Sequence, residues 1–495
     1  MGDVCDVSGG SAFPHAFQGR SSGDYPFFKV GDISAAWKSE QRVLGAAAHY
    51  VTTKEVGVLK ARIHRAGSLV FAKVGAAIAL NRRALLGRES IIDNNCMAIW
   101  APPECIDPDY LFHFSCTLDF GKLTRSSVIP SLRASDLAGI PMPIPPLHEQ
   151  RRIAVALDQL LSHVNSAVAA LNQAKANLER YRESVLHSAV TGSLTAEWRK
   201  ANPAKEDGKA LLDRILRERR VRWEKEQLAS FAAKAKQPPK GWREKYEEPP
   251  APDTTDLSEL PAGWAWTTVE TVANCVSGGT PDRSRSEYFD GDIPWVKSGE
   301  LRDGRIYESE ELISKPALDS SNAKVLPPDT VCIALYGATV GRLGVLAIEA
   351  ATNQAVCGIL PSNWIEHRYA FYYLRSIRAQ LIAQGKGGAQ PNISLGLIRR
   401  TPIPLPPLSE QRHIVARVDR LLSDSEAAMK AVEHRSSAPA ELRRSILKAA
   451  FEGRLEPQDP NDEPASALLE RIKAQSSAAE STKTKNTKIR KAAAK

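Results

Sequence analysis

The chain has 495 residues, of which 43% are hydrophobic and 25% charged, so it is long enough for about two to four domains of ordinary globular composition. Its formal charge of +9 permits binding to a polyanion, although an unspecific basic surface explains that charge equally well. The seven scattered cysteines contain no CxxC pair, which argues against a disulfide framework and a cysteine-based zinc site and favours a reducing, intracellular compartment.

The first segment, about residues 1–140, is expected to form a globular α+β domain. It contains the short stretches VSGG at residues 7–10 and GDYP at residues 23–26. Both return in the second half, as VSGG at residues 276–279 and GDIP at residues 291–294. These echoes predict that a second, divergent copy of the domain follows.

A long helix is predicted over residues 149–190, within a region of near-constant sequence at 141–195. Residues 149–190 contain neither Pro nor Gly. Their apolar residues recur every seven positions in two interleaved series, which is typical of a coiled coil. At 1.5 Å per residue, about 40 helical residues span roughly 60 Å. The predicted seam consists of Ile153, Leu157, Leu160, Val164, Leu171, Leu178, Tyr181 and Val185.

A charged connector, residues 196–256, follows the long helix. Residues 206–235 predict a helix with an apolar minority, and residues 247–256 read as an extended linker. A solvated helix and a docking helix for another subunit are equally good interpretations of the connector. At the C-terminus, residues 481–495 carry six basic residues and no acidic one, which predicts a disordered tail able to add phosphate affinity.

The second half of the chain repeats the first. Residues 141–161 (PMPIPPLHEQRRIAVALDQLL) match residues 402–422 (PIPLPPLSEQRHIVARVDRLL), an offset of 261 residues (402 minus 141) that holds from about residue 130 to 194. We therefore expect a second α+β domain over residues 257–401, a second long helical region over 402–456, and a C-terminal helix with a basic tail over 457–495. The second seam should contain Ile414, Val418, Leu421, Val432, Leu442 and Ile446.

Pro439 should kink or break the second long helix, because proline cannot donate the backbone hydrogen bond that a helix interior needs. Because the two predicted long helices carry apolar seams of equal length, we expect these seams to pack against each other. The expected fold is therefore α+β with an internal duplication, in which two globular domains are separated by two long helices that form an intramolecular antiparallel coiled coil.

The sequence contains no recognisable catalytic signature. It has no P-loop, no HExxH, no GxSxG and neither of the NPPY and DPPY tetrapeptides of amino-methyltransferases. No apolar run reaches the roughly 20 residues of a membrane helix, and nothing predicts a signal peptide. These absences favour a binding protein with no catalytic residue, no metal site and no cofactor of its own.

Candidate contacts to nucleic acid lie in glycine-rich or turn-like stretches, where the backbone can approach a phosphate closely. Residues 385–392 (GKGGAQPN) form the best such loop, and residues 121–125 are its counterpart. For each residue taken singly, a solvated turn is the commoner outcome. The candidates are Lys29, Lys122, Arg125, Lys297, Arg342, Lys386, Gln390 and Asn392.

The duplicated PPLxEQ segments with their helices resemble the specificity subunit of type I restriction-modification enzymes. The helix endings at residues 182–194 and 443–455 carry the same resemblance, as do LPAGWAW at 260–266, GATVGRLG at 337–344 and TNQAV at 352–356. The stretch at 455–472 adds to it. The likeness covers nearly the whole chain, and the duplicated motif is highly specific to that family.

The resemblance implies a cytoplasmic DNA-binding subunit with two target-recognition domains, each of which reads one half of a bipartite, asymmetric DNA target. The paired helices would set the spacing and dock two methyltransferase subunits that carry S-adenosylmethionine. Motor-nuclease subunits would supply ATP- and Mg-dependent cleavage. Two alternatives stay open: a fused DNA-modifying enzyme, which would transfer methyl groups by itself, and a protein-binding coiled-coil scaffold, which would show no DNA sequence preference.

Overall fold

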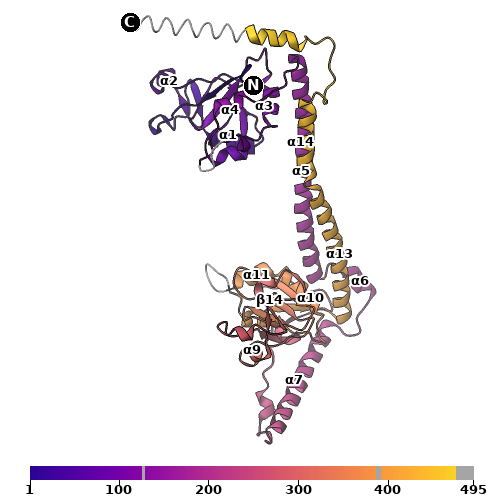
Figure 1. Cartoon of the computed structure of the whole chain (residues 1–495). Helices are drawn as coiled ribbons and strands as arrows, with labels where there is room; N and C mark the ends of the chain where they lie inside the picture. Colours follow the sequence, from indigo (N-terminus) through magenta and orange to yellow (C-terminus); the bar gives the residue numbers. More distant parts are fainter. Residues whose placement is uncertain (125–128, 386–391, 475–495) are drawn as a thin grey trace. The chain divides into compact units, whose positions relative to one another are not determined.

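The computed structural model describes residues 1–124, 129–385 and 392–474. The chain divides into two units, each of which combines one globular domain with part of the long helices (Figure 1). The first unit comprises Met1–Asn172 and Glu433–Lys495, and the second comprises Gln173–Val432. The predicted tail at residues 481–495 lies outside the described residues.

The domain of the first unit is built on a five-stranded sheet with the order β1-β8-β5-β6-β3 and a smaller sheet with the order β4-β2-β7. Its strands are β1 (Asp6–Gly9), β2 (Tyr25–Phe28), β3 (Val43–Leu44), β4 (Tyr50–Val51), β5 (Leu69–Ala72), β6 (Arg83–Leu86), β7 (Ile91–Ile92) and β8 (Cys96–Trp100). Its helices are α1 (Val30–Lys38), α2 (Thr53–Leu59), α3 (Pro108–Ser115) and α4 (Ala134–Ala138), with short 3-10 turns η1 (His15–Phe17), η2 (Ala76–Leu80) and η3 (Phe120–Leu123).

The domain of the second unit has a five-stranded sheet with the order β10-β17-β14-β15-β12, a three-stranded sheet β13-β11-β16 and the pair β18-β9. Its strands are β9 (Ala265–Thr268), β10 (Cys275–Ser277), β11 (Ile293–Val296), β12 (Gly304–Ile306), β13 (Leu312–Ile313), β14 (Val331–Ala334), β15 (Leu343–Leu346), β16 (Ala351–Thr352), β17 (Val356–Ile359) and β18 (Pro402–Leu405). Its helices are α8 (Val269–Val272), α9 (Lys315–Asp319), α10 (His367–Ser376), α11 (Arg378–Gln384) and α12 (Leu395–Arg400), with 3-10 turns η5 (Ser286–Tyr288) and η6 (Ser298–Glu300).

The two domains share one topology. In each five-stranded sheet the last strand in the order is parallel to its neighbour, as β3 is to β6 and β12 to β15, whereas the other pairs are antiparallel. In each small sheet the central strand has one antiparallel and one parallel neighbour. The predicted internal duplication of an α+β domain is therefore confirmed.

The strand register corrects the predicted match between the two VSGG stretches by one residue. Gly9 pairs with Met97 in β8, whereas Ser277 pairs with Cys357, which is the equivalent position in β17. Gly9 therefore corresponds to Ser277, and Gly10 to Gly278. The two identical VSGG stretches therefore give an alignment that is wrong by one residue. Hydrogen bonding across the sheet, and not identity of sequence, fixes the register of a strand.

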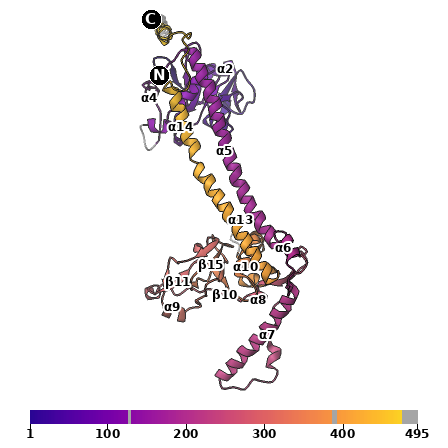
Figure 2. The same ribbon diagram turned by 90° about the vertical axis from the view of Figure 1, so that its right-hand side faces the viewer.

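The predicted long helices are α5 (Leu147–Val190), α13 (Leu408–Arg435) and α14 (Ala438–Phe451). In the first unit α14 lies along the early part of α5, and in the second unit α13 lies along its later part (Figures 1 and 2). Arg443 donates to the side chain of Asn165, and Arg182 Nε donates to Ser425 Oγ at 3.0 Å. The break predicted at Pro439 is confirmed, because α14 begins one residue before it.

The helix pairing is antiparallel in each unit. In the second unit Glu410 contacts Thr195 while Ser425, later in α13, contacts Arg182, earlier in the chain. The same inverse order holds in the first unit, where Arg443 contacts Asn165 while Asp462, later in the chain, contacts Arg152, earlier in α5. An 18-residue window of α5 reaches a mean hydropathy of 1.2, enough for a membrane span by length and composition alone. Of that window 22% is buried inside the structure, and one such helix is weak evidence for a membrane span.

Most predicted seam residues face the helix partner or the adjoining domain. Tyr181 and Leu442 do not: their side chains are 43% and 52% exposed, so this part of the prediction is wrong. Tyr181 lies four heptads after Ile153, and a straight helix drifts about 20° per heptad, whereas Leu442 lies beyond the break between α13 and α14. The buried or half-buried seam residues are Ile153, Leu157, Leu160, Val164, Leu171, Leu178, Val185, Ile414, Val418, Leu421, Val432 and Ile446.

The residues that replace Tyr181 and Leu442 on the buried face obey the same repeat. Leu186 and Ala189 are buried in α5, and their counterparts Leu447 and Ala450 are buried in α14. Each member of the first pair precedes its counterpart by 261 residues. The buried face therefore shifts at the same place in both copies, which is a property of the repeated sequence.

The connector contains α6 (Ala196–Ala201), α7 (Gly208–Ala233) and the 3-10 turn η4 (Trp242–Lys245). Leu211 and Ile215 of α7 are fully buried in the core of the second unit. In the first unit Leu468 and Ile472, in a helical stretch at 465–474, are buried in the same way. The repeated LLxRI sequence thus contributes two buried side chains to the domain core of each unit.

A buried glutamine joins each globular domain to the start of its long helix. Gln150 Nε2 donates to the carbonyls of Cys105 at 3.0 Å and Pro145 at 2.9 Å, while its Oε1 accepts from the backbone N–H of Asp107 at 2.9 Å. Asp107 is the N-cap of α3. The side chain therefore connects the proline-rich approach of α5 with the first turn of a domain helix.

Gln411 repeats this connection in the second unit. It accepts from the backbone N–H of Glu366, the N-cap of α10, at 2.8 Å and donates to the carbonyl of Pro406 at 2.8 Å. Its neighbour Glu410 is also buried and accepts hydrogen bonds from Thr195, Arg199 and Trp264. The EQ of the repeated motif thus serves attachment in this unit, and Trp264, the first tryptophan of LPAGWAW, belongs to the same network.

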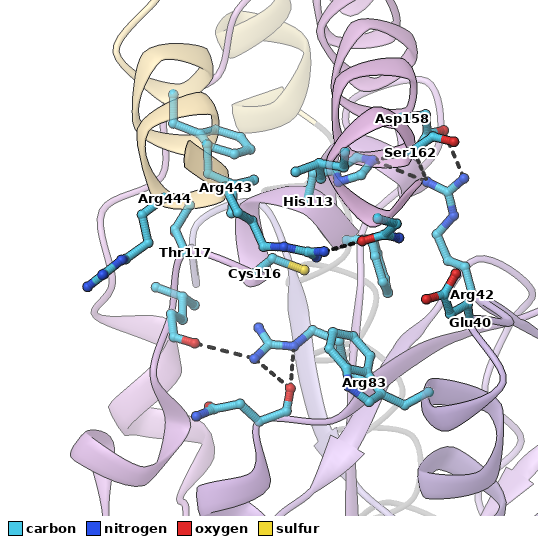
Figure 3. Close-up of a pocket in the computed structure, with 18 of the residues that line it drawn as sticks. Glu40, Arg42, Arg83, His113, Cys116, Thr117, Asp158, Ser162, Arg443 and Arg444 are labelled. Atoms are coloured by element: carbon cyan, nitrogen blue, oxygen red, sulfur yellow. Dashed lines mark hydrogen bonds and ion pairs between the residues drawn. The ribbon is translucent and has the colours of Figure 1, made fainter. Parts of the chain in front are cut away.

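An aspartate two turns further along each helix adds a charged contact. In the first unit Arg42 binds Asp158 through two parallel hydrogen bonds of 2.9 and 2.8 Å, and His113 Nε2 lies 2.8 Å from the same carboxylate (Figure 3). In the second unit Arg368 and Tyr372 both donate to Asp419. Both domains are therefore held at two points on their helix.

Replacing Gln411 with Met keeps the volume but leaves the Glu366 N–H and the Pro406 carbonyl without their partner. A buried polar group without a partner costs about 1–3 kcal/mol, so we expect local opening at the start of α10 to become roughly 5- to 150-fold more frequent. Hydrogen exchange of residues 366–370, measured by mass spectrometry on the full chain, checks this. Gln159→Met on the exposed face of α5 is the control, and equal exchange in both variants would contradict the assigned role.

Acid should weaken the contact around Asp158. Burial lowers the pKa of His113 below its ordinary value of 6.5, so the unfolded chain takes up that proton first and stability falls as the pH drops below about 6.5. Burial alone would raise the pKa of Asp158, but hydrogen bonds from Arg42 and the nearby cations leave it lowered, so its contribution disappears only in stronger acid.

The measurement is the melting temperature of the full chain between about pH 7.5 and 5.5, a window around the ordinary histidine pKa. We expect the wild-type chain to lose more thermal stability over this window than His113→Gln, which keeps a hydrogen-bond donor without titrating. A variant that loses as much as the wild type would show that His113 is not the titrating group.

Candidate nucleic-acid interface

The predicted contacts Lys29 and Lys297 occupy equivalent places, directly after β2 and β11. Lys297 Nζ lies 2.8 Å from Glu311 and 3.1 Å from Glu310, and the hydrogen bond with Glu311 raises its pKa. Lys29 Nζ donates to Gln18 at 2.6 Å and lies 5.3 Å from the ring centre of Phe13. Both ammonium groups already have partners within their own domains, which makes them weaker candidates.

The other described candidates gather around one loop in each domain, between β5 and β6 or between β14 and β15. Arg342 is exposed at the end of the second loop, and the exposed Asn392 precedes Ile393, whose N–H bonds to Leu335 at the start of that loop. Lys122 is exposed on η3, which packs against η2 in the first loop. Arg125, Lys386 and Gln390 lie outside the described residues.

Two glycines shape these loops. Gly75 has a φ of +80° and Gly337 a φ of +86°, a backbone conformation that side chains other than glycine rarely adopt. Each follows the end of a central strand, so the chain turns sharply there. Sequence analysis singled out residues 337–344 for their resemblance, but it did not find the corresponding loop of the first domain, because residues 73–82 share with the second loop only one Gly-Ala pair and the final arginine and are two residues longer than residues 335–342.

A cleft of about 1150 Å³ opens in the first unit between α3, α5 and α14 (Figure 3). Arg83 and Arg443 line it without a carboxylate partner: Arg83 is buried and donates to backbone carbonyls, and Arg443 donates to the amide of Asn165. Burial raises the pKa of the Cys116 thiol, and the two guanidinium groups oppose that effect. The cleft is thus polar and cationic, but each of these groups is held by the fold.

The described part of the chain offers no group of three or more His, Cys, Asp or Glu side chains that could hold a metal ion. Its cysteines are all free thiols, and six of the seven are buried. What the geometry offers instead is a set of exposed amide, ammonium and guanidinium groups on glycine-shaped loops. Such groups donate hydrogen bonds to phosphate oxygens and base edges.

Comparisons with known proteins agree with this description. The family described as "Type I restriction modification DNA specificity domain" matches residues 1–176 and 261–433. The EcoBI specificity subunit of Escherichia coli is 27% identical over 375 residues, which cover 72% of this chain and 68% of that protein. The StySPI specificity subunit of Salmonella potsdam is 25% identical over 414 residues, which cover 78% and 76%.

Solved structures show the same fold. A chain of a type I restriction-modification system aligns with a TM-score of 0.58 at 19% identity and covers 91% of this chain and 98% of its own length. The HsdS subunit from Thermoanaerobacter tengcongensis aligns with a TM-score of 0.54 at 20% identity over 92% and 95%. Since the family matches both halves, this chain belongs to the type I restriction-modification DNA specificity family and is a non-catalytic DNA sequence-specificity subunit.

Proposed function

We propose that each recognition domain reads one half of a bipartite, asymmetric DNA target and that the helix pair sets the gap between the halves. The observation that carries this proposal is a contrast between the way the domains are attached to their helices and the loops that they expose. Both domains are held by the same glutamine and aspartate of the repeat, whereas their exposed loops differ in length and composition. A protein that reads two unlike sequences at a fixed separation needs this combination.

The proposed domain organisation follows the repeat. Recognition domains occupy residues 1–140 and 257–401, helical regions occupy 141–195 and 402–456, and the connector at 196–256 and the segment at 457–495 complete the chain. Half-sites read from one face of B-DNA should lie about one helical turn, roughly 34 Å, apart. This distance is the length of one turn of the DNA duplex, and the gap that the helix pair sets should match it.

We further propose that this cytoplasmic chain works through partners. Two methyltransferase subunits carrying S-adenosylmethionine would dock on the helical regions, and motor-nuclease subunits using ATP and Mg would join for cleavage. The connector helix α7 supports docking, because Val221 and Leu228 leave apolar side chains 66% and 43% exposed. Family membership favours this function over a protein-binding scaffold and over a fused enzyme.

Selection from a random duplex library with the full chain should return two unlike half-sites at one fixed spacing. In the host, deleting the gene should remove one bipartite methylation motif from the genome, and restoring it should return the same motif. A library that converges on no sequence, or a methylation map that does not change on deletion, would overturn the proposed function.

Lys122 and Lys297 form a matched pair for testing phosphate contacts. The Lys122 side chain is 85% exposed and 4.0 Å from its nearest carboxylate, whereas Lys297 is neutralised by Glu310 and Glu311. We expect Lys122→Ala to reduce by about one the slope of log affinity against log salt, while Lys297→Ala leaves that slope unchanged. Fluorescence anisotropy with the selected duplex measures both, and a reversed order would reject this assignment.

A further inference from the structure

One end of the five-stranded sheet carries the same two kinds of polar side chain in both recognition domains. An arginine directly precedes the strand β6 or β15, as Arg82 or Arg342. A side-chain amide lies two residues before β8 or β17, as Asn94 or Gln354. Both pairs are offset by 260 residues (342 minus 82 and 354 minus 94), so the repeat's offset of 261 residues does not align them.

The strand registers establish the equivalence. Val331 pairs with Val345 as Leu69 pairs with Leu85, which places Arg342 where Arg82 lies. Ile333 pairs with Cys357 as Phe71 pairs with Met97, which places Gln354 where Asn94 lies. In both sheets the strand with the amide and the strand after the arginine flank the same central strand. Neighbouring strands lie about 4.8 Å apart, so the two side chains start roughly 10 Å from each other.

These four side chains are available to a ligand. Asn94, Gln354 and Arg342 are exposed and Arg82 is half-buried. Among the residues that the structure describes, neither guanidinium group forms a hydrogen bond or an ion pair. Burial raises the pKa of Tyr336 and the nearby amide of Gln354 opposes that effect, so this amide lies beside the phenol and stays exposed. Folding therefore does not account for the repeated arginine.

The backbone beneath each amide is held tightly. The N–H of Gly10 bonds to Cys96 O at 3.1 Å, and a Cβ on Gly10 would lie 1.9 Å from the carbonyl oxygen of Asp93. The second domain repeats this contact with Gly278, where a Cβ would lie 2.2 Å from Asn353 O. No side chain fits in either place, so backbone packs directly on backbone. A contact group on such a turn loses little conformational freedom on binding.

This end of the sheet points away from the attachment to the helix. Strand β8 begins at the amide turn and leads to Asp107, whose N–H is held by Gln150. Strand β17 leads in the same way to Glu366 and Gln411. Attachment and amide turn thus occupy opposite ends of one strand, and the amide end is not covered by the helix that carries the domain.

We infer that Arg82 with Asn94, and Arg342 with Gln354, contact the sugar–phosphate backbone of the two half-sites, while the preceding residues of the loops, 73–81 and 335–341, read bases. Two unlike half-sites have only their backbone in common. The arginine and the amide are repeated in both domains, which suits contacts to the backbone. The loops differ, because the first contains the 3-10 turn η2 and the second contains no such turn, which suits contacts to unlike bases. The inference rests on the proposed function and divides its DNA contacts into two classes.

The test uses the duplex that the wild-type full chain selects from a random library. We expect Arg342→Ala to bind it about tenfold more weakly with the same preferred bases, and to reduce the salt slope by about one. Gln354→Ala should weaken binding a few-fold with an unchanged slope, because the amide is neutral. Arg82→Ala and Asn94→Ala should behave alike in the first half-site.

Arg88→Ala is the matched control, because Arg88 is an exposed arginine beyond the other end of β6 and its loss removes the same charge. This variant should keep wild-type affinity, and melting curves should show all variants folded. A changed base preference in Arg342→Ala or Gln354→Ala would overturn the backbone assignment, as would unchanged affinity. If the wild-type chain selects no sequence, the proposed function fails, and the inference fails with it.

Discussion

The whole arrangement depends on one buried amide in each repeat. Gln150 and Gln411 are fully buried and connect the proline-rich approach of a long helix to the N-cap of a domain helix. A primary amide suits this place, because it offers a donor and an acceptor in one plane. Without it, a domain would keep only the charged contact of the aspartate and apolar contacts, and apolar contacts do not fix orientation. Recognition at a fixed spacing requires a fixed orientation.

Sequence reasoning found the features that are periodic or repeated without a gap. The match at 141–161 and 402–422 predicted both long helices, and Pro439 predicted the break between α13 and α14. It failed for Tyr181, because a seven-residue series cannot follow the 3.6-residue period of a helix over many turns, and for Leu442, which lies beyond the break between α13 and α14.

The candidate site was harder to predict, since its contacts depend on pairing between distant strands. Lys297 looked like a free cation in the sequence, but Glu310 and Glu311, beside a neighbouring strand, neutralise it. Arg342 was found from its glycine-rich loop, whereas Arg82 was missed, because only the sheet register shows that the two are equivalent. Asn94 and Gln354 differ by one methylene, and their offset of 260 residues (354 minus 94) is one short of the repeat's 261.

The aspartates at the second attachment point bear on how such proteins diverge. Asp158 receives its guanidinium from Arg42, in the stretch between α1 and β3, whereas Asp419 receives it from Arg368 on α10. The carboxylate occupies the same place in both units, whereas its cation comes from a different element in each. Recombination between related genes can therefore transplant a whole variable segment onto a foreign helix, provided that the incoming segment brings its own arginine. A crossover inside the segment would separate the carboxylate from its cation and weaken the attachment of the recognition domain to its helix.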